Sequence, residues 1–130
     1  MDSVDLIEAF ERSEVPNEGF HHRDHVRVLW TYLRERPLLQ ALDRFSAALQ
    51  RFAAHHGKTM LYHETITWAY AVLIHERMQR TPAASWDDFC RENADLLSWR
   101  PSILDRYYQP ETLKSELARR VFILPDRAVH

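Results

Sequence analysis

The chain has 130 residues, of which 45% are hydrophobic and 28% are charged, and its formal net charge at pH 7 is -2. This length predicts a single helical domain over residues 1–130 with a core of its own. The near-neutral charge argues against nucleic acid or an anionic membrane as a partner. The two glycines, Gly19 and Gly57, are too few for a hairpin-rich β fold or for a glycine-rich phosphate loop.

Cysteine usage and the amino-terminal residues bear on the compartment. One cysteine, Cys90, excludes an internal disulfide and suits a reducing environment. The first residues lack the basic segment and apolar run of a signal peptide. No apolar stretch reaches the ~18 residues that a membrane span needs. We therefore expect a cytoplasmic protein without a membrane partner.

The first predicted helix covers residues 3–14, with Ser3 as its N-cap and apolar side chains up to Phe10 on one face. Residues 16–19, Pro-Asn-Glu-Gly, are typical of a turn and end it.

Two longer helices follow, over residues 22–36 and 37–56. On the first, the helical period places His22 and His25 on the buried side. The second has apolar residues in a helical stripe and is followed by Gly57, a typical residue after a helix end. The short connection between them predicts an antiparallel pair.

The next helix, residues 62–80, is the most hydrophobic element of the chain. Nearly every position from Ile66 to Ile74 is apolar or aromatic, which predicts a helix buried on every face. Its first turn is polar, however, and includes His63 and Glu64. Such groups are costly to bury without partners, so we expect other residues to meet them there.

The last third is less regular. Ser85 is typical of a helix start, Pro101 and Pro110 can each open a short helix, and residues 111–120 are helical by composition. Residues 121–130 begin with an apolar run and predict an extended strap. We therefore expect an all-α fold, an antiparallel bundle of four main helices with two or three additional short helices.

Histidines are abundant, and the predicted topology gathers most of them. An antiparallel series puts the start of the second helix, the end of the third and the start of the fourth at one end. That end receives six of the eight histidines in the chain: His21, His22, His25, His55, His56 and His63.

Imidazole is a common ligand for zinc and suits other transition metals. His22 and His25 lie one helical turn apart and can point toward one metal ion. His63 is the natural third ligand. His56 or Glu64 supplies a fourth, or Glu64 acts as a general base. Zinc, iron, nickel and manganese all remain open as the metal.

A structural interpretation competes with the metal site. Histidines at helix ends also interact with backbone groups, and His63 and Glu64 can serve the start of a buried helix. In that case the polar cluster only fixes the bundle.

Two motifs carry a resemblance. Two stretches, Phe20-His21-His22-Arg23-Asp24-His25 and Tyr62-His63-Glu64-Thr65-Ile66-Thr67, resemble a group of small bacterial helical proteins of unassigned function, in which the motifs F-x-H-x-D-H and Y-H-E-T recur. The resemblance singles out six residues: His22, Asp24, His25, His63, Glu64 and Thr67. The expected bundle is also similar in architecture to the metal-binding bundles of the DinB-like superfamily, although their ligand spacing does not align with this sequence.

Two functions are therefore expected. The first is a small metal-binding protein, with enzyme activity left open, that activates water or a small ligand at the histidine cluster. The second is a non-enzymatic helical interaction module with a structural polar cluster.

Overall fold

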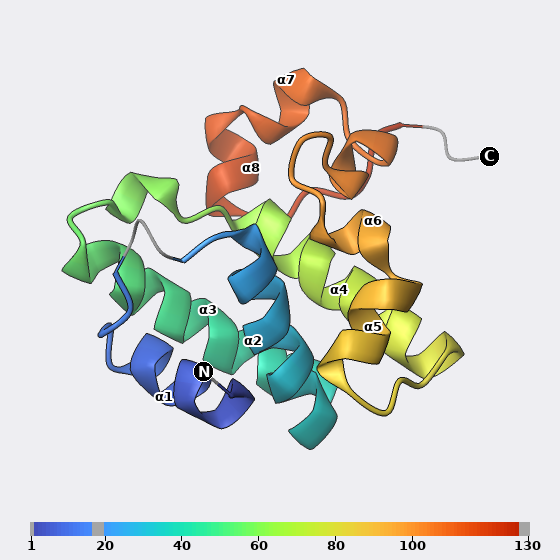
Figure 1. Cartoon of the computed structure of the whole chain (residues 1–130). Coiled ribbons are helices and arrows are strands. Elements are labelled where there is room, and N and C mark those ends of the chain that lie inside the picture. The colour runs from blue at the N-terminus through green and yellow to red at the C-terminus, as the bar shows by residue number, and fades with distance from the viewer. Residues whose placement is uncertain (1, 17–19, 128–130) are drawn as a thin grey trace. The chain divides into compact units, whose positions relative to one another are not determined.

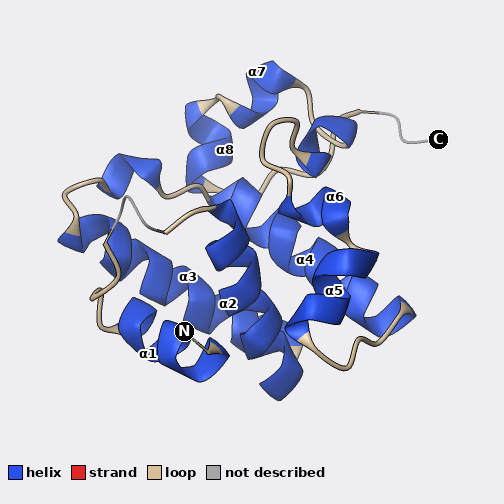
Figure 2. Ribbon diagram, viewed as in Figure 1, coloured by secondary structure: helices blue, strands red, loops and turns tan. Residues whose placement is uncertain are grey.

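The computed structural model describes residues 2–16 and 20–127, and these form helices and loops without a β-strand (Figures 1 and 2). The predicted all-α fold class is confirmed. Within the described residues, no helix is long and apolar enough to cross a membrane. The chain divides into two compact units, Met1–Tyr62 and His63–His130. The single domain over residues 1–130 stays a prediction.

The first unit is a set of three packed helices. It contains α1 (Ser3–Glu11), α2 (His22–Glu35), α3 (Leu38–His55) and the short 3-10 helix η2 (Thr59–Leu61). Two residues join α2 to α3, so these helices fold back on each other as predicted, and α1 packs against both (Figure 1).

The start of α1 differs from the prediction by one residue. The N-cap is Asp2, whose carboxylate accepts a hydrogen bond of 2.8 Å from the backbone N–H of Asp5. Ser3 is the first helical residue instead, and its hydroxyl accepts a hydrogen bond from Arg27 of α2 at 3.0 Å. Asn17, Glu18 and Gly19 of the predicted turn lie outside the described residues.

Four phenylalanines from α1, α3 and the loop before α2 form the core of the first unit. The ring of Phe10 lies 4.9 Å from that of Phe20, 5.9 Å from Phe45 and 5.4 Å from Phe52, between ring centres. All four are buried. Burying a phenylalanine stabilises a fold by about 1.5–3 kcal/mol, so this cluster holds α1, α3 and the loop before α2 together.

The second unit is built on one long helix and several short ones. In chain order these are α4 (Glu64–Arg80), α5 (Trp86–Glu92), α6 (Ala94–Leu97), the 3-10 helix η3 (Ile103–Arg106), α7 (Pro110–Leu113) and α8 (Glu116–Arg120).

The four short α-helices of this unit are one more than the largest number predicted. The helix that begins after Ser85 is interrupted at Asn93, whose side chain donates to the carbonyl of Phe89 at 3.0 Å. The helix predicted over residues 111–120 is likewise interrupted, because Ser115 caps α8 by accepting from the N–H of Ala118 at 3.1 Å. Side chains that bond the backbone compete with helix continuation in this way.

The prediction that the fourth helix is buried on every face is wrong. Thr65, Ala71 and Ile74 are fully buried, but Trp68 is 37% exposed and Val72 is 46% exposed. Residues four apart share a helix face, so α4 presents an apolar stripe to solvent.

Candidate functional site

His63 is the N-cap of α4 and uses both ring nitrogens inside the second unit. Its Nδ1 accepts a hydrogen bond from the backbone N–H of Ile66 at 3.1 Å. Its Nε2 lies 2.7 Å from the carbonyl oxygen of Leu113 at the end of α7. Because Nδ1 is the acceptor, the ring proton of the neutral imidazole is on Nε2, which donates to Leu113.

The surroundings of His63 favour its neutral form. Burial lowers its pKa below the ordinary value, and the positive charge of Arg119 lowers it further, while the hydrogen bond to Leu113 acts in the opposite direction. A neutral imidazole can accept at the helix start, which a protonated ring cannot do. His63 therefore acts as a helix cap that also holds α7.

Thr65, the second residue of α4, is fully buried and binds the end of α8 and the residues that follow it. Its hydroxyl lies 2.7 Å and 2.8 Å from the carbonyl oxygens of Ala118 and Val121, and its one hydrogen faces both. The same oxygen accepts from the backbone N–H of Ile123 at 3.1 Å. Thr65 thus satisfies three backbone groups where α8 ends.

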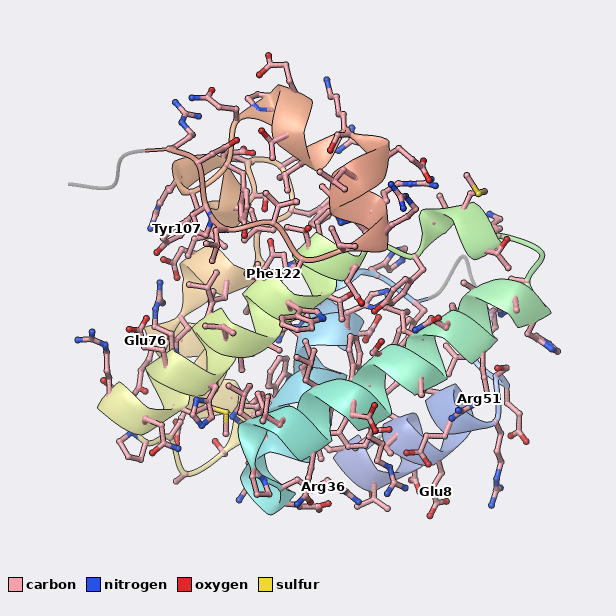
Figure 3. The ribbon with its side chains drawn as sticks, turned by 180° about the vertical axis from the view of Figure 1, so that it is seen from behind. Glu8, Arg36, Arg51, Glu76, Tyr107 and Phe122 are labelled. Carbon is pink, nitrogen blue, oxygen red and sulfur yellow. The ribbon has the colours of Figure 1, made fainter. Side chains whose placement is uncertain are left out.

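The C-terminal segment, residues 121–127, contacts α4 at Trp68 and then passes beside residues 107–112. The ring of Phe122, which is labelled in Figure 3, stacks on that of Trp68 with 5.0 Å between ring centres. The hydroxyl of Tyr108 donates to the carbonyl of Ile123 at 2.7 Å. Asp126 accepts from the N–H of Gln109 at 2.9 Å, just before α7. Residues 128–130 of the predicted strap lie outside the described residues.

His25 lies in the first unit among phenylalanine rings. Its ring centre is 4.5 Å from that of Phe20, 6.3 Å from Phe45 and 6.5 Å from Phe10. Burial lowers the pKa of His25 to about 3, and the positive charge of nearby His22 adds to the effect. His25 is therefore neutral at pH 7.

His56 ends α3 at the same end of the first unit. Its Nε2 lies 3.2 Å from the carbonyl oxygen of Val15, so Nε2 carries the hydrogen and donates. Its ring lies 4.6 Å from Phe52, and Phe52 in turn lies 5.3 Å from Phe20, which packs against His25. The start of α2 and the end of α3 thus meet through phenylalanine rings.

The two carboxylates of the motifs occupy helix starts. Asp24 accepts a hydrogen bond of 3.0 Å from the backbone N–H of His21, which caps the first turn of α2. Glu64 is the first residue of α4 and is half-buried. Its role as a metal ligand or general base stays a prediction.

The structure therefore brings some of the predicted ligands together within one unit. His22 and His25 share a helix start, and His56 lies at the same end of the first unit. Within residues 2–16 and 20–127, no three His, Cys, Asp or Glu side chains are placed to hold a metal ion. The convergence of six histidines joins residues of both units and stays a prediction.

One polar cluster in the structure was not predicted from the sequence. The hydroxyl of Tyr32 donates to Glu11 at 2.5 Å, and Nε of Arg44 donates to the same carboxylate oxygen at 2.8 Å. The hydrogen bond from Arg44 is the main reason that the pKa of Glu11 lies below its ordinary value. These residues are 21 and 33 positions apart along the chain, and no local pattern links them.

The fold and the contacts of the motifs define an all-α chain in which His63 binds the end of α7 and Thr65 binds the end of α8 and the start of the C-terminal segment. No protein-family model, curated protein or solved structure matches the chain.

Proposed function

We propose that this chain is a non-enzymatic helical interaction module, which binds a partner protein beside its C-terminal segment. The observation that carries this proposal is the use of the motif residues. His63 holds Leu113, and Thr65 holds residues 118–123, so these polar groups are engaged in building the second unit. This is a structural role, and it leaves α4 with an exposed apolar face.

The binding surface that we propose is defined by Trp68, Val72, Val121 and Leu124, and is called the α4–tail surface. Leu124 is 73% exposed, and the other three are also exposed. The stack of Trp68 on Phe122 brings α4 and the segment together at this surface. Exposed apolar side chains that gather on one part of a protein mark interaction sites, whereas single ones are ordinary. A partner with an apolar segment of its own fits this surface.

The test begins with crosslinking in a cytoplasmic extract of the host, because Cys90 suits a reducing compartment. The partner is then purified, and its affinity is measured with purified chain. Combining Val72→Lys with Leu124→Lys should weaken binding by about tenfold or more, since each charge must be desolvated in the interface.

Leu39→Lys is the matched control. Leu39 is an exposed leucine of the first unit, whereas all residues of the proposed surface belong to the second unit. The Leu39→Lys variant should therefore bind the partner as the wild type does. Equal affinities for the wild type and the double variant, or the failure of any purified partner to bind, would overturn the proposal.

Metal binding is the second candidate, and the His22–His25 pair favours it. His25 is held neutral, which is the form that binds metal, and His22 lies one turn away. We propose that a divalent zinc, iron, nickel or manganese ion binds this pair, with His56 and His63 as further ligands and Glu64 as a ligand or general base. For this, His63 must release one of its two hydrogen bonds.

Chelation tests this candidate. A chelator should lower the melting temperature of untagged protein at pH 7.5, because bound metal stabilises the folded chain. His63→Ala should remove that effect, whereas His75→Ala, at a histidine outside the predicted ligand set, should preserve it. Identical responses of the two variants would exclude His63 as a ligand, and metal analysis of the wild type would give the identity of any ion.

A further inference from the structure

An open groove on the first unit is lined mainly by charged side chains. Its volume is about 430 Å³, and its lining residues are Glu11, Arg36, Gln40, Asp43, Arg44 and Arg51. A groove of this volume matches a small-molecule ligand in size. Three arginines and two acids give the lining a net charge of +1.

The sequence of α3 produces one wall of this groove. Gln40, Arg44 and Arg51 follow one another at spacings of four and seven residues, which places them on one face of the helix. Arg36 joins this wall from the end of α2. Figure 3 shows Arg36 and Arg51 on the side of α3 next to α1.

The buried ring of Tyr32 and the half-buried carboxylate of Glu11 position two of the three guanidinium groups. Arg44 donates to both carboxylate oxygens of Glu11, at 2.8 Å and 3.4 Å, and Tyr32 donates to the same carboxylate. The guanidinium carbons of Arg36 and Arg44 lie 5.4 Å and 5.8 Å from the centre of the buried Tyr32 ring. Glu11 therefore serves to orient Arg44, and its oxygens already have donors.

Arg51 is the cation most available to a ligand. It is exposed, and it makes no ion pair or hydrogen bond with the residues that the structure describes. A guanidinium group matches the oxygens of phosphate and carboxylate groups with two parallel N–H donors. Gln40 adds a neutral hydrogen-bond donor to the lining.

We infer that this groove binds a small oxyanion with two or more negative charges, an organic phosphate or a polycarboxylate. The arginines hold the charged oxygens, while Asp43 accepts hydrogen bonds from hydroxyl groups of the same ligand. This site is independent of the α4–tail surface, because every lining residue belongs to the first unit.

Titration calorimetry of the full chain with inorganic pyrophosphate, and separately with citrate, tests the inference. Binding should weaken as salt is raised, because the groove is open and its charges are screened. Arg51→Gln should weaken binding of the preferred anion by about fivefold or more. The anion that binds more tightly identifies the phosphate or the carboxylate class.

Arg80→Gln is the control, since Arg80 is an exposed arginine of the other unit. It removes the same charge and should leave the affinity unchanged. The inference is overturned if neither anion binds, if Arg51→Gln binds as tightly as the wild type, or if Arg80→Gln weakens binding equally. Circular dichroism of each variant verifies that the helices are intact.

Discussion

His25 is a single side chain whose lowered pKa makes the folding stability of the chain depend on pH. Phenylalanine rings surround its imidazole, and the charge of His22 adds to the cost of protonation. The ordinary pKa of 6.5 applies to the unfolded chain, and the folded value is about 3. Between these two values the unfolded chain binds a proton that the folded chain does not. Acid therefore favours unfolding through this residue. The free energy of unfolding is unaffected by His25 only above pH 6.5, and it falls as the pH drops below that value.

We predict that the free energy of unfolding falls, through His25, by about 1.4 kcal/mol for each pH unit below about 6. His25→Leu should remove this part of the pH dependence, because leucine cannot be protonated. Urea unfolding of both proteins at several values between pH 4.5 and pH 7.5 measures the difference in slope. Equal slopes would show that His25 is protonated in the folded chain, contrary to its position among the rings.

At the scale of elements, Thr65 links α4 to the end of α8. Two carbonyls and one N–H of the following backbone meet its hydroxyl, and the site is closed to water. A buried backbone group without a partner costs about 1–3 kcal/mol. The hydroxyl, rather than the methyl group, is therefore what the C-terminal segment requires.

Thr65→Val should destabilise the chain by about 2 kcal/mol. Valine has the same shape as threonine but lacks the hydroxyl group, so the three backbone groups lose their partner. Thr65→Ser keeps the hydroxyl and should cost less. The segment should also separate more readily from α4 in the valine variant, so trypsin should cleave faster after Arg119 and Arg120. Similar cleavage rates in the two variants would mean that the hydroxyl does not hold the segment.

Helix positions could be predicted from the sequence because their signals are local. The predicted second, third and fourth helices match α2, α3 and α4 to within two residues at each end. Ser85 was a correct helix start because a cap needs only the next turn of chain. The break at Asn93 was missed, since its side chain also accepts from Arg77 of α4, which is 16 residues away.

The contacts of the candidate site were harder to predict, because they join residues that are far apart in the sequence. That polar groups meet the first turn of α4 was expected, but their partners, Leu113, Ala118 and Val121, are 50 or more residues away. Hydrophobic periodicity also overestimated the burial of α4. It identifies apolar positions without showing whether another element covers them, and Trp68 and Val72 are only partly covered.

At the scale of the whole molecule, the polar groups of the two units have different structural roles. In the first unit, Glu11, Tyr32 and Arg44 join three helices at the wall of a charged groove. In the second, His63 and Thr65 attach the last third of the chain to α4. The charged groove and the α4–tail surface that we propose as binding sites therefore belong to separate units.

Both ring nitrogens of His63 form hydrogen bonds within the second unit, which leaves neither free for a metal ion. Long-range ¹H–¹⁵N correlation NMR of the imidazole rings at pH 7.5, with and without equimolar zinc, tests it most directly. We expect a neutral His63 with its hydrogen on Nε2 and a hydrogen bond at each nitrogen, and the same signals after zinc is added. A hydrogen on Nδ1, or a shift of either nitrogen to a metal-bound position on addition of zinc, would contradict it.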